Sequence, residues 1–143
     1  MDSIILLSPR EDVFSVICQY VTPLQKNNAG VMLTDSLLIS SDLNDMTDRS
    51  LLLINNDLPL KNPFFLDTLH PVITYGCHPK STVTASSICE DKMVCCIQRP
   101  LQWREDFLIE PQEIPVSLGN YSISSVLGGI CVLLLSFGES FFS

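Results

Sequence analysis

Residues 51–87 read LLLINNDLPLKNPFFLDTLHPVITYGCHPKSTVTASS and carry the strongest structural signal in the chain. Two short apolar runs, residues 51–54 and 72–75, are each followed at once by polar, turn-forming residues. Parallel strands that are buried in an α/β protein end in this way when a site lies at their carboxyl ends. The segment therefore predicts two parallel strands with a site beside them.

Length, composition and charge limit what the whole chain can be. It has 143 residues, of which 46% are hydrophobic, and this suits one domain with a substantial core. Its formal net charge is −8, and its eight Lys and Arg residues are scattered. Nucleic acids and anionic membranes bind clustered basic residues, so we expect neither as a partner. A protein partner or a second copy of the chain remains open.

The lengths of the apolar runs and the spacing of the cysteines indicate the cellular compartment of the protein. The first residues, MDSIILLSPRED, contain an apolar run too short for the core of a signal peptide. The longest apolar stretch, residues 126–137, has twelve residues, against the ~20 that a membrane-spanning helix needs. We therefore expect a cytoplasmic protein, in which the six cysteines are buried thiols. No Cys-x-x-Cys pair is present, so no metal or other cofactor is predicted.

Apolar periodicity predicts further elements on both sides of residues 51–87. The first helix has an apolar face that is expected to pack on the sheet. In the last helix the adjacent Gly128 and Gly129 are costly unless close packing requires them. The predicted elements are a strand over residues 3–7, a helix that begins at Ser8 and Pro9, a strand over residues 31–39 with a break near Asp35, a short helix over residues 64–69, and a helix over residues 123–137.

The pattern changes after Lys80. Short β-branched or alternating runs follow, separated by charged or proline-containing turns, which favours antiparallel hairpins. The predicted fold class is α/β: a small, mostly parallel sheet flanked by helices, with an antiparallel β-hairpin extension over about residues 82–116. Residues 1–143 are treated as a single domain.

Three stretches resemble one enzyme family. Asn55, Asp57 and Pro59 match an Asn-Ala-Asp-Asp-Pro turn, and residues 73–76 match the strand and glycine that follow it. Residues 118–129 fall where the family has Gly-Arg-His-Asn-x-x-Asn-Ala-Leu-Ala-Ala. These stretches resemble the second half of the central domain of the Mur ligases, which join amino acids to the nucleotide-linked precursor of bacterial peptidoglycan. The resemblance implies a bacterial protein associated with the cell wall.

The chain departs from that family at the positions that carry its chemistry. It has no GxxxxGK[ST] loop, so the backbone cradle, lysine and magnesium-binding hydroxyl that ATP activation needs are absent. Asn120, Tyr121, Ser122 and Ser125 replace the family's Arg, His and two Asn. The resemblance then implies a non-catalytic module that binds a protein partner or a nucleotide-like ligand. The alternative is an accessory half of an ATP-dependent amide ligase that another chain completes.

Candidate ligand-binding residues follow the two central strands, and no catalytic residue is assigned. By resemblance, Asn55 and Asp57 contact a ribose or an adenine; by local chemistry they equally suit an Asx turn. A lysine among hydroxyl groups after the second strand suits a small anion, such as phosphate or carboxylate, or is a solvated loop lysine. The candidate site comprises Asn55, Asp57, Tyr75, His78, Lys80 and Ser81.

Two further features have a functional and a structural interpretation. Trp103, Arg104 and Phe107 indicate either a contact surface for a partner or a Trp that covers the core of the antiparallel extension. Cys77 becomes reactive only if a neighbouring cation lowers its pKa.

Overall fold

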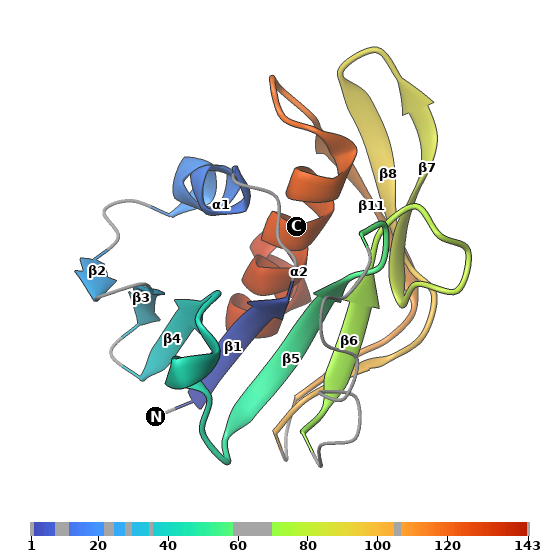
Figure 1. Cartoon of the computed structure of the whole chain (residues 1–143). Helices are drawn as coiled ribbons and strands as arrows, with labels where there is room; N and C mark the ends of the chain where they lie inside the picture. The colour runs from blue at the N-terminus through green and yellow to red at the C-terminus, as the bar shows by residue number, and fades with distance from the viewer. Residues whose placement is uncertain are drawn as a thin grey trace.

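The computed structural model describes residues 2–7, 12–21, 25–27, 30–34, 36–58, 70–104 and 107–142. The strands of its main sheet are β1 Asp2–Leu7, β2 Gln25–Asn27, β3 Gly30–Thr34, β4 Leu37–Ser40, β5 Ser50–Asn55, β6 Val72–Tyr75, β7 Val83–Cys89, β8 Lys92–Ile97 and β11 Gln112–Ser117. These nine strands lie in the order β11-β8-β7-β6-β5-β1-β4-β3-β2 (Figure 1). The remaining elements are a separate antiparallel pair, β9 Leu101–Gln102 with β10 Leu108–Ile109, the helices α1 Val13–Tyr20 and α2 Ile123–Phe137, and the 3-10 turns η1 Leu43–Asp45 and η3 Glu139–Phe142.

The centre of the sheet is parallel. β4, β1, β5 and β6 run side by side in one direction, and Asn55 lies opposite Tyr75 where β5 and β6 end. The two apolar runs are thus neighbouring parallel strands, as predicted. The chain order reverses at β1, with β4 on one side and β5 on the other. Sheets of this kind bind ligands outside the carboxyl ends of the strands near such a reversal.

The antiparallel extension continues the same sheet. β7 starts beside the end of β6, through a single parallel pair between Tyr75 and Val83. β7, β8 and β11 then pair antiparallel, which confirms the extension predicted over about residues 82–116. The hairpin of β7 and β8 projects beyond the ends of β5 and β6 (Figure 1). The extension therefore stands beside the carboxyl edge of the parallel strands.

The opposite end of the sheet differs from the prediction. A single strand over residues 31–39 is wrong, because β3 and β4 form an antiparallel hairpin in which Val31 lies opposite Ile39. The break predicted near Asp35 falls between these strands, although residue 35 itself lies outside the described residues. β2 pairs antiparallel with β3 at the edge of the sheet.

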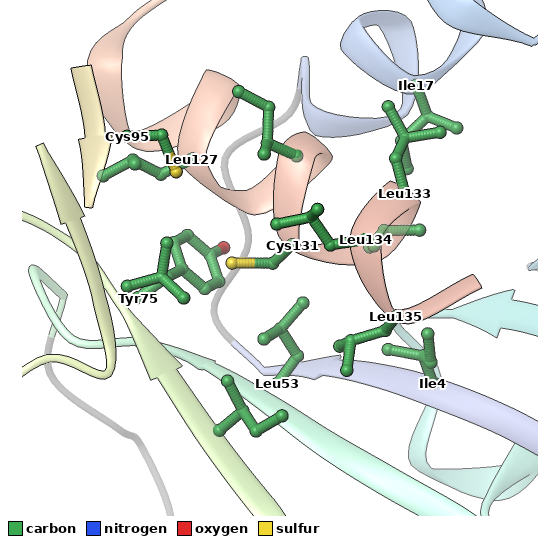
Figure 2. Packing of buried hydrophobic residues seen from close by; sticks show 14 of the residues in the cluster. Ile4, Ile17, Leu53, Tyr75, Cys95, Leu127, Cys131, Leu133, Leu134 and Leu135 are labelled. Carbon is green, nitrogen blue, oxygen red and sulfur yellow. The ribbon is translucent and has the colours of Figure 1, made fainter. Parts of the chain in front are cut away.

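The helices α1 and α2 cover one face of the sheet. Ile4, Leu53 and Tyr75 point from the strands into this main core, where they meet the buried side of α2 (Figure 2). On the other face, Ile5 and Leu52 belong to a smaller buried cluster, against which residues of and beside η1 pack. Within the described part of the chain, the expected helices therefore flank only one face of the sheet.

The adjacent glycines of α2 explain its close packing. A Cβ atom on Gly128 would lie 2.9 Å from Cζ of Tyr75, and one on Gly129 would lie 2.6 Å from Cγ1 of Val16. α1 consequently packs mainly on α2 instead of directly on the sheet, which corrects the prediction for its apolar face. Both glycines are required by close contact with large neighbours.

Two predicted features fall outside the described residues. They are the helix start at Ser8 and Pro9 and the short helix over residues 64–69. The helix predicted over residues 123–137 is confirmed by α2. None of the helices in the described part of the chain is both long and apolar enough to cross a membrane.

Candidate functional site

Asn55 forms the turn that leaves β5. Its side chain is fully buried, and its Oδ1 accepts the backbone N–H of Asp57 at 3.0 Å. This is the Asx turn that the sequence left open as an alternative to ligand contact. The next residue, Asn56, donates its backbone N–H to the Tyr75 carbonyl at 2.7 Å. The end of β5 is therefore fixed to the end of β6 by short hydrogen bonds.

Asp57 fastens the same two strand ends with its carboxylate. Both of its carboxylate oxygens lie 2.9 Å from the backbone N–H of Cys77. Gly76 has φ +142°, and a Cβ atom there would lie 2.8 Å from Oδ1 of Asp57. Only glycine fits this position, because it permits both the backbone angle and the close approach. Asp57 thus has a structural partner at the place where a ligand contact was predicted.

Tyr75 belongs to the core. Its side chain has no exposed surface, and its ring lies against α2 beside Cys131 (Figure 2). Within the described residues its hydroxyl has no hydrogen-bond partner. Burial, and secondarily the nearby Cys131 and Asp57, raise the pKa of Tyr75 well above its ordinary value. A phenol in this position cannot reach a ligand outside the strand ends.

His78, Lys80 and Ser81 do lie together, in the loop between β6 and β7. The backbone N–H of Lys80 donates to Nδ1 of His78 at 3.1 Å, and the N–H of Ser81 donates to the His78 carbonyl at 3.0 Å. Ser81 is buried, and its hydroxyl accepts a hydrogen bond from the Asn56 side chain at 3.2 Å. The side chains of His78 and Lys80 are exposed.

Two residues of this site, Gln98 and Arg99, were not predicted. Gln98 donates its side-chain amide to the carbonyls of Pro79 and Ser81, at 3.1 and 2.6 Å. The guanidinium of Arg99 donates to the Lys80 carbonyl and, at 3.4 Å, to the Thr82 hydroxyl. Three successive carbonyls of the loop are therefore bound by two successive side chains. We call residues 78–81 together with Gln98 and Arg99 the clamped loop.

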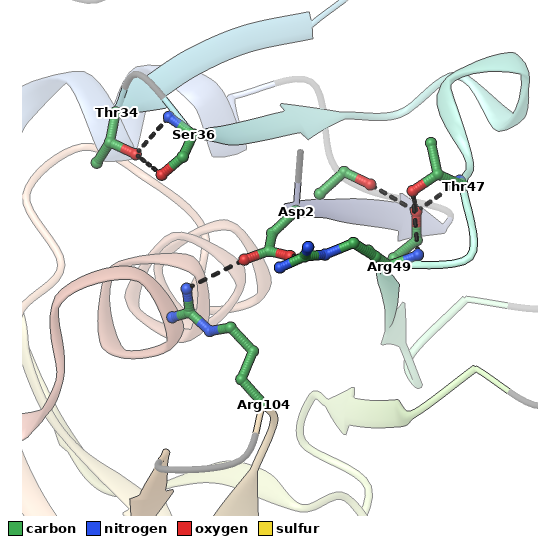
Figure 3. Close-up of polar contacts among 8 residues, drawn as sticks. Asp2, Thr34, Ser36, Thr47, Arg49 and Arg104 are labelled. Atoms are coloured by element: carbon green, nitrogen blue, oxygen red, sulfur yellow. Dashed lines mark hydrogen bonds and ion pairs between the residues drawn. The ribbon is translucent and has the colours of Figure 1, made fainter.

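The clamped loop carries unpaired positive charge. Lys80 and Arg99 are exposed, and across the described ranges neither lies within ion-pair distance of a carboxylate. The ion pairs found there join Asp2 to Arg49 at 2.7 Å and to Arg104 at 3.5 Å (Figure 3). In a chain of net charge −8, two such cations on one loop form a local attraction for anions.

Trp103 covers the core, so it is not the exposed contact residue that the partner-surface interpretation assigned to it. Its side chain is 6% exposed and belongs to the main core. The guanidinium of Arg104 lies 4.4 Å from the centre of the Trp103 ring and donates to the carbonyl of Leu135 at 3.2 Å. Arg104 also reaches Asp2 of β1 (Figure 3). These contacts join α2, β1 and the segment after β9.

The six cysteines are all free thiols, but only some are buried. Burial raises the pKa of Cys95 to about 12 and that of Cys131 well above its ordinary value. Cys18, Cys77 and Cys89 are exposed, so the prediction of buried thiols is wrong for these three. In the ranges that the structure describes, no group of three or more His, Cys, Asp or Glu side chains is arranged to hold a metal ion.

Cys77 is not activated by its neighbours. Partial burial, followed by the charge of Asp57, raises the pKa of its thiol. A reactive thiolate needs the opposite shift.

The serines near the start of α2 serve the helix. The hydroxyl of Ser122 accepts the backbone N–H of Ser125 at 3.2 Å and donates to the Ser125 hydroxyl at 2.8 Å. The Ser125 hydroxyl in turn donates to the carboxylate of Asp12, just before α1. Ser122 and Ser125 therefore cap α2 and join it to the start of α1.

A shallow groove of about 420 Å³ lies elsewhere, over the beginning of β8 and the end of β11. Val94 and Pro115 lie side by side within it, and Lys92 and Ser117 do so next to them. Arg99 follows the other end of β8, so the groove and the clamped loop are separate features.

Comparison with protein-family models gives no match, and a search of the curated proteins gives no significant match. Function is therefore inferred from the geometry of the strand ends and the clamped loop.

Proposed function

We propose that this chain is a non-catalytic binding module that takes an anionic group of a nucleotide-like ligand, or of a protein partner, at the clamped loop. The observation that carries this proposal is the division of roles at the carboxyl edge. Asn55 and Asp57 hold the turns, whereas Lys80 and Arg99 remain exposed and unpaired with acids in the described part of the chain. The loop also follows β6 at the carboxyl edge of the parallel strands, the edge at which α/β sheets bind ligands.

The same geometry supports a role without catalysis. General acid–base chemistry needs a titratable group within hydrogen-bond reach of the substrate. Here the Asp57 carboxylate is bound to a backbone N–H, and Nδ1 of His78 accepts another. The pKa of the Cys77 thiol is raised, which disfavours a nucleophile. The clamped loop is thus better suited to holding an anion than to transforming it.

We further propose that the module is related to the Mur ligase central domain and acts in the bacterial cytoplasm, in cell-wall synthesis. What supports this is the position of the matched residues. Asn55 and Asp57 follow one parallel strand, and residues 73–76 form and follow its neighbour. Gly128 lies on α2, in close contact with the same neighbouring strand.

Calorimetric titration of the purified chain with ADP and ATP, with and without Mg²⁺, tests the proposed function. We expect weak binding that does not depend on Mg²⁺, no ATP hydrolysis, and weaker but still measurable binding in Lys80→Ala. Lys92→Ala is the matched control, because it removes a surface lysine at the far end of β8. Tight binding that requires Mg²⁺, or hydrolysis of ATP, contradicts the proposal and favours an accessory half of an amide ligase.

A further inference from the structure

Hydrogen bonds within the protein hold the clamped loop in shape. The carbonyls of Pro79, Lys80 and Ser81 all face the end of β8, where Gln98 and Arg99 bind them. The backbone N–H of Gln98 also donates to the Thr82 carbonyl at 2.8 Å. Reorienting the loop would break several hydrogen bonds at once. A site that is already ordered loses less entropy on binding than a flexible one.

Arg99 retains donors that no group in the described part of the chain uses. A guanidinium has five N–H donors in a planar fork. Within the described residues only Nη2 of Arg99 is engaged, with the Lys80 carbonyl and the Thr82 hydroxyl. The Nη1 and Nε donors are left, on an exposed side chain next to the backbone of Lys80. Arginine favours phosphate and carboxylate groups because the fork matches their paired oxygens.

We propose that Arg99 and Lys80 form a two-cation site for a single oxyanion, and that Gln98 is the positioning residue that sets the loop in place. This inference rests on the proposed binding function and names the ligand group: a phosphate or a carboxylate. Gln98 acts through the loop backbone and does not touch the ligand. Asp57 does not oppose the anion directly, because its carboxylate is directed to the N–H of Cys77.

Titration with inorganic phosphate and, in a second arm, with acetate tests the two-cation site and distinguishes the two oxyanions. We expect Arg99→Ala to weaken phosphate binding about tenfold, the loss typical of one charge-assisted hydrogen bond. Arg99→Lys retains the charge and is expected to recover part of the loss.

A matched control for the Gln98 variant described next is Gln112→Met, because Gln112 donates its side-chain amide to the Glu110 carbonyl and the Glu139 carboxylate, away from the loop.

Gln98→Met tests the positioning role, since it preserves side-chain length and removes both donors. We expect weaker phosphate binding, faster amide hydrogen exchange in residues 80–82, and a small decrease in the thermal midpoint, because two hydrogen bonds to the loop are lost. The effect should vanish in a Lys80→Ala background, because a positioning residue acts through the group that it positions. An equal loss in both backgrounds contradicts this role.

The outcomes separate this inference from the proposed function. Wild-type binding that Arg99→Ala and Gln98→Met leave unchanged overturns the two-cation site, while a binding module stands. If neither phosphate nor acetate binds the wild-type chain, the two-cation site is overturned and the nucleotide titration decides the proposed function by itself.

Discussion

The phenol of Tyr75 is fully buried, and its hydroxyl has no hydrogen-bond partner in the described part of the chain. A buried polar group without a partner costs stability, because its bonds to water are lost without replacement. We therefore expect Tyr75→Phe to raise the free energy of unfolding by about 1 kcal/mol in urea denaturation. Tyr20→Phe, at a side chain 38% exposed, is the control and should change nothing measurable. A less stable Tyr75→Phe variant contradicts the lack of a partner.

The thiol of Cys77 provides a test of local electrostatics. Burial and then Asp57 raise its pKa, so the thiolate fraction at a given pH is smaller than for an ordinary cysteine. Asp57→Asn removes the charge and retains an oxygen that can accept the Cys77 N–H. We expect iodoacetamide to modify Cys77 a few-fold faster in this variant at fixed pH, and the rate to rise with pH in both proteins.

Peptide mapping by mass spectrometry measures that rate, and the exposed Cys18 serves as the internal control. An unchanged Cys77 rate with an unchanged Cys18 rate would show that Asp57 has no influence on the thiol.

The contact between α1 and α2 depends on the absence of one side chain. Alanine normally stabilises a helix by about 1 kcal/mol relative to glycine. At Gly129, however, the new Cβ atom would lie 2.6 Å from Cγ1 of Val16, and overpacking of this kind costs about 1–3 kcal/mol. We expect Gly129→Ala to lower the free energy of unfolding and Val16→Ala to rescue part of the loss. Additive effects in this double-mutant cycle would contradict direct contact between the helices.

The ends of the secondary-structure elements show what local sequence can predict. α2 has the predicted bounds because its apolar run begins after Ser122, whose hydroxyl accepts the Ser125 N–H, and ends before Gly138, which has φ +85°. Likewise, β5 and β6 end where apolar residues give way to turn formers. Such signals lie within a few residues of the boundary that they mark.

Contacts between residues that are far apart in the chain could not be predicted from the sequence. Gln98 and Arg99 reach residues 79–81 only because Val83 lies opposite Ile97 in the β7–β8 pair. A shift of this register would place other side chains beside the loop, and the sequence contains no separate signal for it. Likewise, Tyr75 was predicted at the end of its strand, whereas its burial depends on the packing of α2, whose Gly128 lies against its ring.

One main core extends along the sheet from β3 to β11. It includes Ile4 of β1, Tyr75 of β6 and Ile114 of β11, together with α1 and α2. Trp103, the single Trp of the chain, lies in this core beyond β9. We expect equilibrium unfolding in urea to be one transition, with Trp fluorescence and far-ultraviolet circular dichroism giving the same midpoint. Separate midpoints would show that the antiparallel extension unfolds independently of the parallel strands.

The most direct test locates the bound anion. Amide resonances of the whole chain are followed by ¹H–¹⁵N NMR spectroscopy during titration with inorganic phosphate and with ADP, each with and without Mg²⁺. We expect saturable shifts at residues 77–82 and 98–99 that are independent of Mg²⁺ and are lost when Lys80 and Arg99 are both replaced by alanine. Shifts centred on the groove of β8 and β11, or no saturable shifts, would contradict anion binding by the clamped loop.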